Sequence, residues 1–470
     1  MAVVTAGSPG AVDDATIEQW HAAYASNDKN LLATNAVCVS DVADVLLNRD
    51  SVVDNTDVEF DHRMQYDEAK ATDQKSTGRC WIFAATNVIR LHFIKKFGLS
   101  DSFEFSQPYL FFWDKLEKAN YFLESIIKTR SEPLDSRLVH HLLSTPINDG
   151  GQYDMIINLI SKHGLVPKSA FPESKHSCNS RRMNQIIITK LREFAQVLRD
   201  ASKASDESAL RAIKSKQMSE IYSIMCIFFG IPPKQFTWSF RNKEKKYVEH
   251  PKLTPLTFVG QLIDFDVTDM VSLISDPRNP YYKLYTVDYL GNVVGGRDVR
   301  YSMMSLCATP LRIVDLSSSL VNVPIEVLNE LAARSIEGGE PVWFGCDVGK
   351  HFHREMHVMD LGIFNYNLVF NTKFNQNREQ RLRYGQSLMT HAMVFNAFHG
   401  EVGNVSRWRV ENSWSDKNNK GFATMTNDWF NEYVYQIVVN KSLLSPEILA
   451  VYDQVPTVLP PWDPMGSLAN

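Results

Sequence analysis

Cysteine is scarce and scattered in this sequence. Its six cysteines stand far apart and form no C-x-x-C pair. This spacing argues against a disulfide framework and against a zinc finger, and it is typical of a protein in a reducing compartment. We therefore expect a cytosolic protein. The cysteines are Cys38, Cys80, Cys178, Cys226, Cys307 and Cys346.

Long apolar runs and an excess of one charge are also missing. No stretch approaches the roughly 18 consecutive apolar residues of a membrane span. The opening segment MAVVTAGSPGAVDD has neither the basic nor the apolar region of a signal peptide. The 49 basic and 54 acidic residues leave a net charge of −5, which excludes a global attraction to nucleic acid. We expect a soluble protein without a membrane partner.

Hydrophobic periodicity divides the 470 residues into helical, mixed and strand-rich parts. The pattern predicts helices over 13–26, over 80–97, within 105–165 and over 181–229. After about residue 335, short alternating segments such as PVWFGCDV and YQIVVN predict strands. A chain of this length is sufficient for two or three domains. The fold class is therefore expected to be α+β.

Cys80 stands where a polar loop meets an apolar helical segment. The segment 80–97 is apolar on nearly every side and ends with Lys95, Lys96 and Gly98, a usual helix C-terminus. A helix start stabilises a thiolate by about 0.3–1 kcal/mol, which is less than one pKa unit. Because this is too little to make a nucleophile, we expect a histidine partner.

Four motifs share one order with those of the papain-like cysteine peptidases, which the sequence resembles. The resemblance implies that Cys80 attacks a carbonyl carbon while His391 holds the thiolate as an ion pair and then protonates the leaving amine. It implies that Asn412 orients the imidazole and that Gln74 donates its amide to the oxyanion. Trp414 would cover the histidine–asparagine bond. The motifs are Gln74, Cys80-Trp81, His391-Ala392 and Asn412-Ser413-Trp414.

The histidine and the asparagine belong to adjacent strand patterns. THAMVFNAF and SRWRVENSW both alternate, and HGEVGNV joins them with Gly400 and Gly403 in positions that suit turns. We expect the two strands to pair in a small antiparallel barrel. His391 and Asn412 would then face the helix that begins at Cys80.

The sequence also departs from the usual papain-like pattern. The segment STGRC lacks the second cysteine that many relatives carry before the nucleophile, which fits a cytosolic enzyme. Cys80 and His391 are 311 positions apart, whereas papain-like enzymes need about 130–150. The surplus is expected to form an insertion at about 166–335. Ser415 stands where many relatives have glycine.

With these departures the sequence resembles the bleomycin hydrolase family, through DQKSTGRCWIFAATNVIR, NDGGQYDM, PVWFGCDVGKHF, YGQSLMTHAMV and VENSWSDKNNKGF. The resemblance implies a two-lobed papain-like core, one lobe helical and one an antiparallel β-barrel, with a mainly helical insertion and a C-terminal arm. The expected segments are an N-terminal piece (1–64), the helical lobe (65–165), the insertion (166–335), the barrel lobe (336–452) and the arm (453–470).

The resemblance further implies a cytosolic aminopeptidase of broad specificity. Its partners would be short peptides with a free N-terminus and the amide of bleomycin. It would need no cofactor or metal, and it would form a homohexamer whose active sites face a central cavity.

The C-terminal arm has a specific role in this family, where it lies in the cleft and pairs its terminal carboxylate with the ammonium group of the substrate. Asn470 would carry that carboxylate here, or Ala469 if the last residue is trimmed. Gly150 and Gly151 resemble the cleft wall and, with Trp414 and Asn470, are expected to contact substrate. A proline-rich arm is stiff and loses little entropy on docking. The residues alone equally permit a disordered tail.

Two other segments suggest competing functions. KHFHREMH (350–357) brings three histidines together, but a zinc peptidase needs H-E-x-x-H, so we expect no metal and a solvated or interface loop. RNKEKKYVEHPK (241–252) is basic and would repeat in a hexamer. The alternative function is therefore a hexameric nucleic-acid-binding protein with secondary peptidase activity, and the alternative for the segment is a solvated loop.

Overall fold

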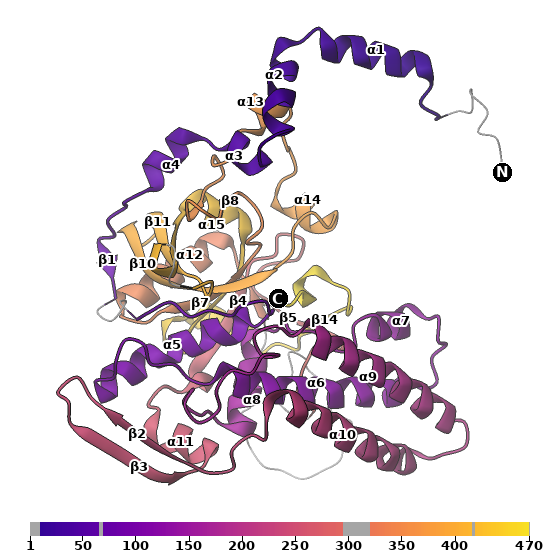
Figure 1. Cartoon of the computed structure of the whole chain (residues 1–470), viewed down its shortest axis with the longest axis vertical. Helices are drawn as coiled ribbons and strands as arrows, with labels where there is room; N and C mark the ends of the chain where they lie inside the picture. The colour runs from indigo at the N-terminus through magenta and orange to yellow at the C-terminus, as the bar shows by residue number, and fades with distance from the viewer. Residues whose placement is uncertain (1–9, 65–68, 295–319, 416–418, 470) are drawn as a thin grey trace.

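The computed structural model describes residues 10–64, 69–294, 320–415 and 419–469. Strands gather in one half of the molecule and long helices in the other, as Figure 1 shows, and the C-terminus lies where the two halves meet. Cys307 and Asn470 lie outside the described residues.

The helical half begins with the helix of Cys80. It spans Cys80–Phe97 and ends at Gly98 in the left-handed conformation, φ 58°, as predicted. Nearly all of its side chains are buried because it lies between the sheet and the other helices. The helices of this half are α5 (Cys80–Phe97), α6 (Gln107–Lys128), α7 (Arg137–Ser144) and α8 (Tyr153–His163).

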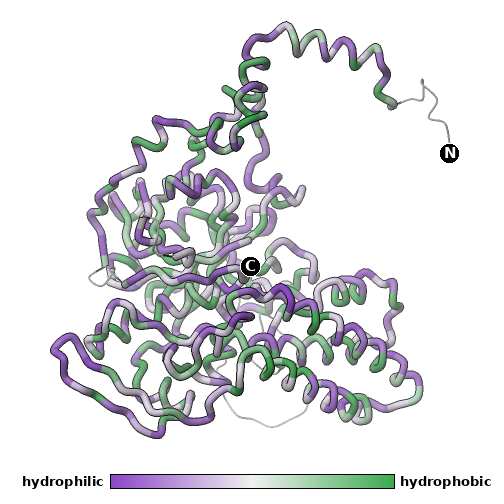
Figure 2. The backbone as a smooth tube through the Cα atoms, viewed as in Figure 1, coloured by the Kyte–Doolittle hydropathy of each residue, from purple (hydrophilic) through white to green (hydrophobic). Residues whose placement is uncertain are grey.

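The next segment is the expected, mainly helical insertion, and it contains strands as well as helices. Two long helices pack beside α6, and a two-stranded hairpin projects from the helical half. The turn of this hairpin is hydrophilic (purple in Figure 2). The elements are α9 (Arg181–Ala201), α10 (Glu207–Phe229), β2 (Phe236–Arg241), β3 (Tyr247–Leu253), α11 (Pro255–Leu262) and η1 (Val267–Asp269).

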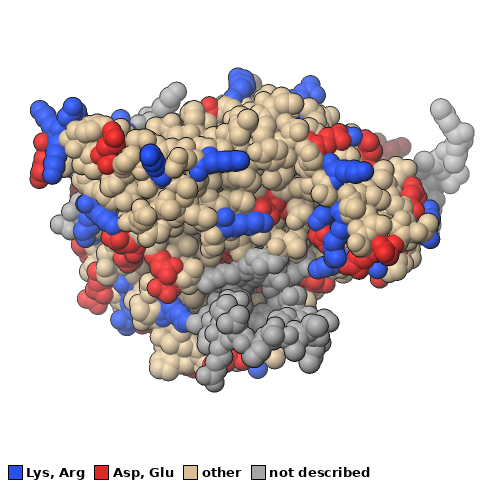
Figure 3. Space-filling view, turned by 90° about the horizontal axis from the view of Figure 1, so that it is seen from below, with Lys and Arg blue, Asp and Glu red and all other residues tan. Residues whose placement is uncertain are grey.

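The basic segment 241–252 is therefore a hairpin turn and strand rather than a loop. Arg241, Lys243, Lys245 and Lys246 are exposed there, and so are Glu244 and Glu249 among them. Figure 3 shows basic and acidic side chains interspersed over the face that contains this end of the molecule. Carboxylates thus partly neutralise the positive charge of the hairpin.

One large sheet of twelve strands forms the other half, counted over the described residues. Its order is β14-β5-β6-β4-β13-β7-β10-β11-β12-β9-β8, with β1 beside β10. The strands are β1 (His62–Arg63), β4 (Met270–Ile274), β5 (Lys283–Val287), β6 (Leu320–Asn322), β7 (Val342–Cys346), β8 (Phe352–His353), β9 (Val358–Met359), β10 (His391–Glu401), β11 (Asn404–Glu411), β12 (Phe422–Thr426), β13 (Val434–Asn440) and β14 (Thr457–Leu459).

This sheet as a whole is mixed. Within 336–452 the pairs β7/β10, β10/β11, β11/β12 and β7/β13 are antiparallel, as expected, whereas closure of these strands into a small barrel stays a prediction. The pairs β4/β6, β5/β14 and β9/β12 are parallel. Strands β4, β5 and β6 come from the expected insertion, yet they extend the sheet beyond β13. Periodicity identifies strands but gives neither their neighbours nor their direction. The coarser prediction of an α+β fold is confirmed.

The remaining helices cover the sheet or lead away from it. Short helices α12 (Ile325–Glu337), α13 (Tyr366–Phe370), α14 (Arg378–Arg383), α15 (Asn427–Tyr433) and α16 (Pro446–Val451) join or flank the strands. The N-terminal helices are α1 (Asp14–Ala25), α2 (Asp28–Val37), α3 (Val42–Leu46) and α4 (Arg49–Asn55). Asp13 caps α1, and α1 projects from the body of the molecule without a buried residue (Figure 1).

Candidate active site

The thiol of Cys80 lies at the contact between α5 and the sheet. Cys80 is the first residue of α5 and is fully buried. Helix α5 packs against β10, and the backbone N–H of Ala392 hydrogen-bonds to the sulfur. Burial raises the pKa of the Cys80 thiol to about 12, although the N–H groups of Ala392, Trp81 and Cys80 oppose that shift. The helix start alone therefore does not ionise the thiol.

His391 immediately precedes the residue that contacts the sulfur. It is the first residue of β10 and pairs with Cys346 of β7. Its Nε2 lies 3.0 Å from Oδ1 of Asn412, which follows the last residue of β11. Because the amide oxygen only accepts, Nε2 carries a proton and Nδ1 is left as the base. The predicted histidine–asparagine pair is present.

Burial also determines the charge of the imidazole. Loss of water lowers the pKa of His391 to about 4; the hydrogen bond to Asn412 opposes this shift, and the positive charge of Arg354 adds to it. Neither a lone thiolate nor a lone imidazolium is favoured in this site. A proton transfer from the thiol to the imidazole would create both charges together, so an opposite charge would offset the cost of each.

Gln74 lies in the loop before the nucleophile. Its backbone N–H donates to the carbonyl of Ser413 at 2.9 Å, which joins this loop to the segment after β11. Its Nε2 donates to the carbonyl of Thr77 at 2.7 Å. A carboxamide has two N–H hydrogens, so this bond fixes the amide and leaves the second hydrogen for another acceptor.

Trp414 stands over the imidazole. The centroids of the Trp414 and His391 rings are 5.1 Å apart. The guanidinium of Arg354 lies 5.1 Å from the centre of the Trp414 ring, within the range of a cation–π contact. Trp414 remains 37% exposed. Sequence reasoning missed Arg354, because the partner of an arginine on a surface turn depends on the tertiary fold.

Gly150 and Gly151 pass directly beside the nucleophile helix. A Cβ on Gly151 would lie 2.5 Å from the ring of Trp81, which explains the glycine. The backbone N–H of Gly151 donates to the carbonyl of Ala469 at 3.0 Å, and the carbonyl of Gly150 accepts from Nζ of Lys118 at 2.5 Å. The end of the chain therefore lies against this wall.

The arm that ends at Ala469 is held by side chains as well as by backbone. Nε2 of Gln152 lies 3.2 Å from each of the carbonyl oxygens of Met465 and Ser467. The hydroxyl of Ser467 donates to the carbonyl of Met389 at 2.7 Å. Ala469 is fully buried. Residues 457–469 are therefore an ordered arm, so the alternative of a disordered tail was wrong for them.

Of the histidines in 350–357, His353 is buried and His351 and His357 are partly exposed, so the segment is not a simple solvated loop, and the interface alternative stays a prediction. His353 belongs to β8 and is buried, while the ring of His351 stacks on Tyr433 at 5.9 Å. Nδ1 of His353 accepts from the backbone N–H of Met356. Among the residues that the structure describes, no group of three His, Cys, Asp or Glu could hold a metal ion.

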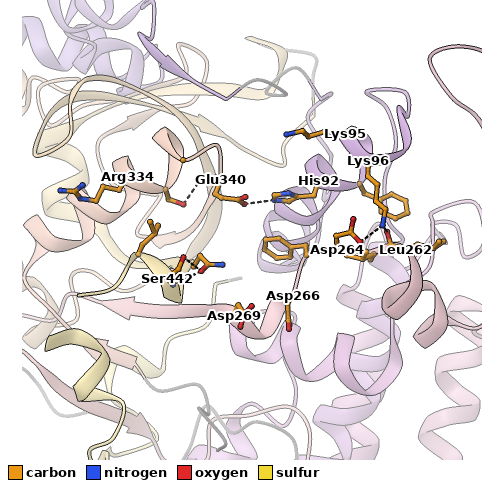
Figure 4. A pocket seen from close by; sticks show the side chains of 17 residues that line it. His92, Lys95, Lys96, Leu262, Asp264, Asp266, Asp269, Arg334, Glu340 and Ser442 are labelled. Carbon is orange, nitrogen blue, oxygen red and sulfur yellow. Dashed lines mark hydrogen bonds and ion pairs between the residues drawn. The ribbon is translucent and has the colours of Figure 1, made fainter. Parts of the chain in front are cut away.

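A separate hollow of about 710 Å³ lies at the other end of α5. Figure 4 shows two ion pairs in its lining: His92 with Glu340 at 2.9 Å and Lys96 with Asp264 at 2.6 Å. Twelve residues of helix separate His92 from Cys80, or about 18 Å. This hollow is therefore distinct from the candidate active site.

Comparisons with known proteins agree with this geometry. The model of the Peptidase C1-like family matches residues 11–309 and 313–466. The chain belongs to the Peptidase C1-like family. Two similar proteins are named bleomycin hydrolase. The one from Gallus gallus is 46% identical over 94% of this chain and 95% of the relative. The one from Homo sapiens is 43% identical over 95% of this chain and 96% of the relative.

Two further similar proteins are bacterial. Aminopeptidase C from Streptococcus thermophilus is 40% identical, with 96% of this chain and 98% of the relative covered. The crystal structure of PepW from Lactobacillus rhamnosis superposes with a TM-score of 0.91 at 38% identity, covering 98% of this chain and all of that one. The predicted resemblance to bleomycin hydrolase and the prediction of a cysteine peptidase are confirmed.

The same comparisons give no support to nucleic-acid binding as the main function. In the described part of the chain, no helix combines the length and the apolar character needed to cross a membrane. Cys38, Cys80, Cys178, Cys226 and Cys346 are free thiols.

Proposed function

We propose that the chain is an aminopeptidase that removes single residues from the free N-terminus of short peptides, with Cys80 as nucleophile. Its thiol attacks the carbonyl carbon of the first residue while its proton moves to Nδ1 of His391. Asn412 holds the imidazole through Nε2. The developing oxyanion accepts hydrogen bonds from the backbone N–H of Cys80 and from Nε2 of Gln74.

The second half of the reaction uses the same proton. The imidazolium of His391 donates it to the leaving amine, and the C–N bond breaks to give a thioester on Cys80. Water then attacks the thioester, its proton goes to His391, and the released amino acid leaves Cys80 to recover the proton. Trp414 keeps bulk water away from the pair of His391 and Asn412.

The backbone hydrogen bond between Gly151 and Ala469 is the observation that supports exopeptidase action. The backbone of Gly151 is where a substrate strand would pair, and the arm already occupies it. A substrate therefore has room for one residue before the scissile bond. A carboxylate at the end of the arm, on Asn470 or on a trimmed Ala469, would pair with the ammonium group of the substrate.

The relatives named bleomycin hydrolase suggest a second substrate with the same chemistry. Bleomycin would enter through its terminal amide, because Cys80 needs only an accessible carbonyl next to a free amine. We further propose a cytosolic location, which the free thiols support.

A homohexamer completes the proposal. Helix α1 buries none of its residues and leaves an apolar face of Ile17, Trp20 and Tyr24 exposed. Such a face is costly in water unless another surface covers it. Deletion of residues 1–26 is expected to lower the oligomeric state in sedimentation measurements, and an unchanged hexamer would contradict this role of α1.

Two substrates and one variant test the enzymatic proposal. Leucine 4-nitroanilide should be hydrolysed, whereas its N-acetylated form should not. Iodoacetamide and Cys80→Ala should each abolish the activity. A Cys80→Ala protein that remains active, or equal rates on the two substrates, would overturn the proposal.

A further inference from the structure

A cluster of buried charges lies directly behind the cleft wall. Asp114, Lys115, Lys118 and Asp149 are each at most 6% exposed. Nζ of Lys115 lies 2.5 Å from the Asp149 carboxylate, and Nζ of Lys118 lies 2.7 Å from Asp114. Charges of this kind are costly to bury unless each has partners. Four such residues beside Gly150 need a specific explanation.

The Asp149 carboxylate accepts hydrogen bonds from three separate parts of the chain. One oxygen accepts from Lys115 of α6 and from Nδ2 of Asn184 of α9 at 2.6 Å. The other accepts from the hydroxyl of Ser180 and from the backbone N–H of Gly78 at 3.3 Å. Ser180 is the N-cap residue of α9, yet its side chain forms no capping bond there.

The contact with Gly78 connects this carboxylate to the chemistry. Gly78 stands two residues before Cys80, in the loop that also contains Gln74. The Asp149 carbonyl accepts from Nε1 of Trp81 at 2.8 Å, so the residue is tied to both sides of the nucleophile. Lys118 also binds this wall, because its Nζ donates to the carbonyl of Gly150.

We propose that Asp149 is a positioning residue: its carboxylate holds the loop of Gly78 so that the oxyanion donors at Cys80 and Gln74 are in place. This inference rests on the proposed function.

The substitution Asp149→Asn separates this role from general stability. An amide has one accepting oxygen, which will turn to the charged Lys115 and put its NH₂ against the N–H of Gly78. We expect kcat to fall about 10- to 100-fold, with weaker binding of leucinal, whose tetrahedral adduct uses the same donors. Alkylation of Cys80 by iodoacetamide should stay within about 3-fold of wild type, because it forms no oxyanion.

Lys115→Met is the matched comparison. It also breaks the buried pair, but it leaves Asp149 free to hold Gly78, so kcat should stay within about 3-fold even though the melting temperature falls. In Asp149→Asn/Lys115→Met the amide oxygen can turn to Gly78, and kcat should recover from the value of the single variant. If Asp149→Asn does not fold, a double variant with nearly wild-type kcat supports the inference, and one reduced more than about 10-fold overturns it.

Glu117→Gln controls for the loss of a buried charge. Glu117 lies on α6, as Lys115 does, and its carboxylate pairs with Lys162 and His163. The substitution should leave kcat unchanged. Equal losses of kcat in Lys115→Met and Asp149→Asn, or no loss in the latter, would overturn the inference. Absence of thiol-dependent activity in the wild-type protein would contradict the proposed function instead.

Discussion

The backbone N–H of Gly151 donates to the carbonyl of Ala469 across 3.0 Å, so the end of the chain occupies the wall where a substrate would pair. Removal of residues 467–470 should free this N–H while η4 (Pro464–Gly466) and the ion pair of Asp463 with Arg278 remain. N-acetylated peptides should then be cleaved. The kcat/KM for leucine 4-nitroanilide should fall about 10- to 100-fold, because one charge-assisted hydrogen bond to the ammonium is lost. Assays with free and blocked peptides measure both effects.

A chain that ends at Ala469 is the control for this truncation. It keeps the pairing with Gly151 and moves the terminal carboxylate by one residue. It should still refuse blocked peptides. If the chain without residues 467–470 also fails to cleave N-acetylated peptides, the arm does not determine exopeptidase action.

The contact between His391 and Asn412 gives a second prediction. Asn412→Ala removes the acceptor of Nε2, so the ring is free to rotate and to change tautomer. We expect kcat to fall about 10- to 100-fold with little change in KM, because the pair acts in the transition state rather than in binding. Steady-state kinetics on leucine 4-nitroanilide check this.

Asn412→Asp supplies the comparison. Its carboxylate still accepts from Nε2, and its negative charge should raise the pKa of His391. Activity should therefore exceed that of Asn412→Ala at neutral pH. Equal losses in the two variants would mean that the contact does not orient the ring.

Local signals account for what the sequence predicted correctly. Helix α5 begins at Cys80 and ends at Gly98, because cations in the last turn and a glycine in the left-handed region terminate helices in most folds. The strands of His391 and Asn412 were visible as alternation, and a short turn between them made their pairing the simplest arrangement. Motif order singled out His391 among thirteen histidines, and its catalytic role stays a prediction.

Contacts between segments far apart in the chain account for the features that the sequence did not predict. Asp149 and Gln152 are polar residues beside a double glycine, and nothing in their neighbourhood indicates partners such as Ser180 or Met465. Likewise, β4 extends the sheet although it precedes the strand-rich part of the chain by more than sixty residues. Periodicity reports that a residue is buried, but not against what.

The close approach of Gly151 to Trp81 yields a third prediction. In Gly151→Ala the new Cβ would lie 2.5 Å from the indole, so the wall or the ring must move. We expect a loss of about 1–3 kcal/mol in the free energy of unfolding, together with a higher KM, because the proposed substrate strand would pair with this wall. Denaturant unfolding and steady-state kinetics measure the two effects.

Gly260→Ala is the matched control for Gly151→Ala. Gly260 lies within α11, and a Cβ there would meet nothing within 4 Å. Alanine should stabilise this helix by up to about 1 kcal/mol. If both substitutions shift stability in the same direction, the contact with Trp81 does not determine the response.

Because Cys80 and His391 are buried, the acid limb of the pH–rate profile should reveal whether the pKa of His391 is lowered. The active pair carries one proton, shared between thiol and imidazole, and loses activity when a second proton binds. Because the pKa of His391 is lowered from 6.5 to about 4, kcat/KM should stay high well below pH 6.5 and fall only as the pH drops toward that lowered pKa.

Arg354 tests the electrostatic part of this shift. Its positive charge lowers the pKa of His391, so Arg354→Met should raise that pKa and move the acid limb to higher pH. Arg354→Lys keeps the charge and should leave the limb close to that of the wild type, although its contact with Trp414 is altered. If Arg354→Lys and Arg354→Met move the limb equally, packing on Trp414 rather than charge controls the protonation of His391.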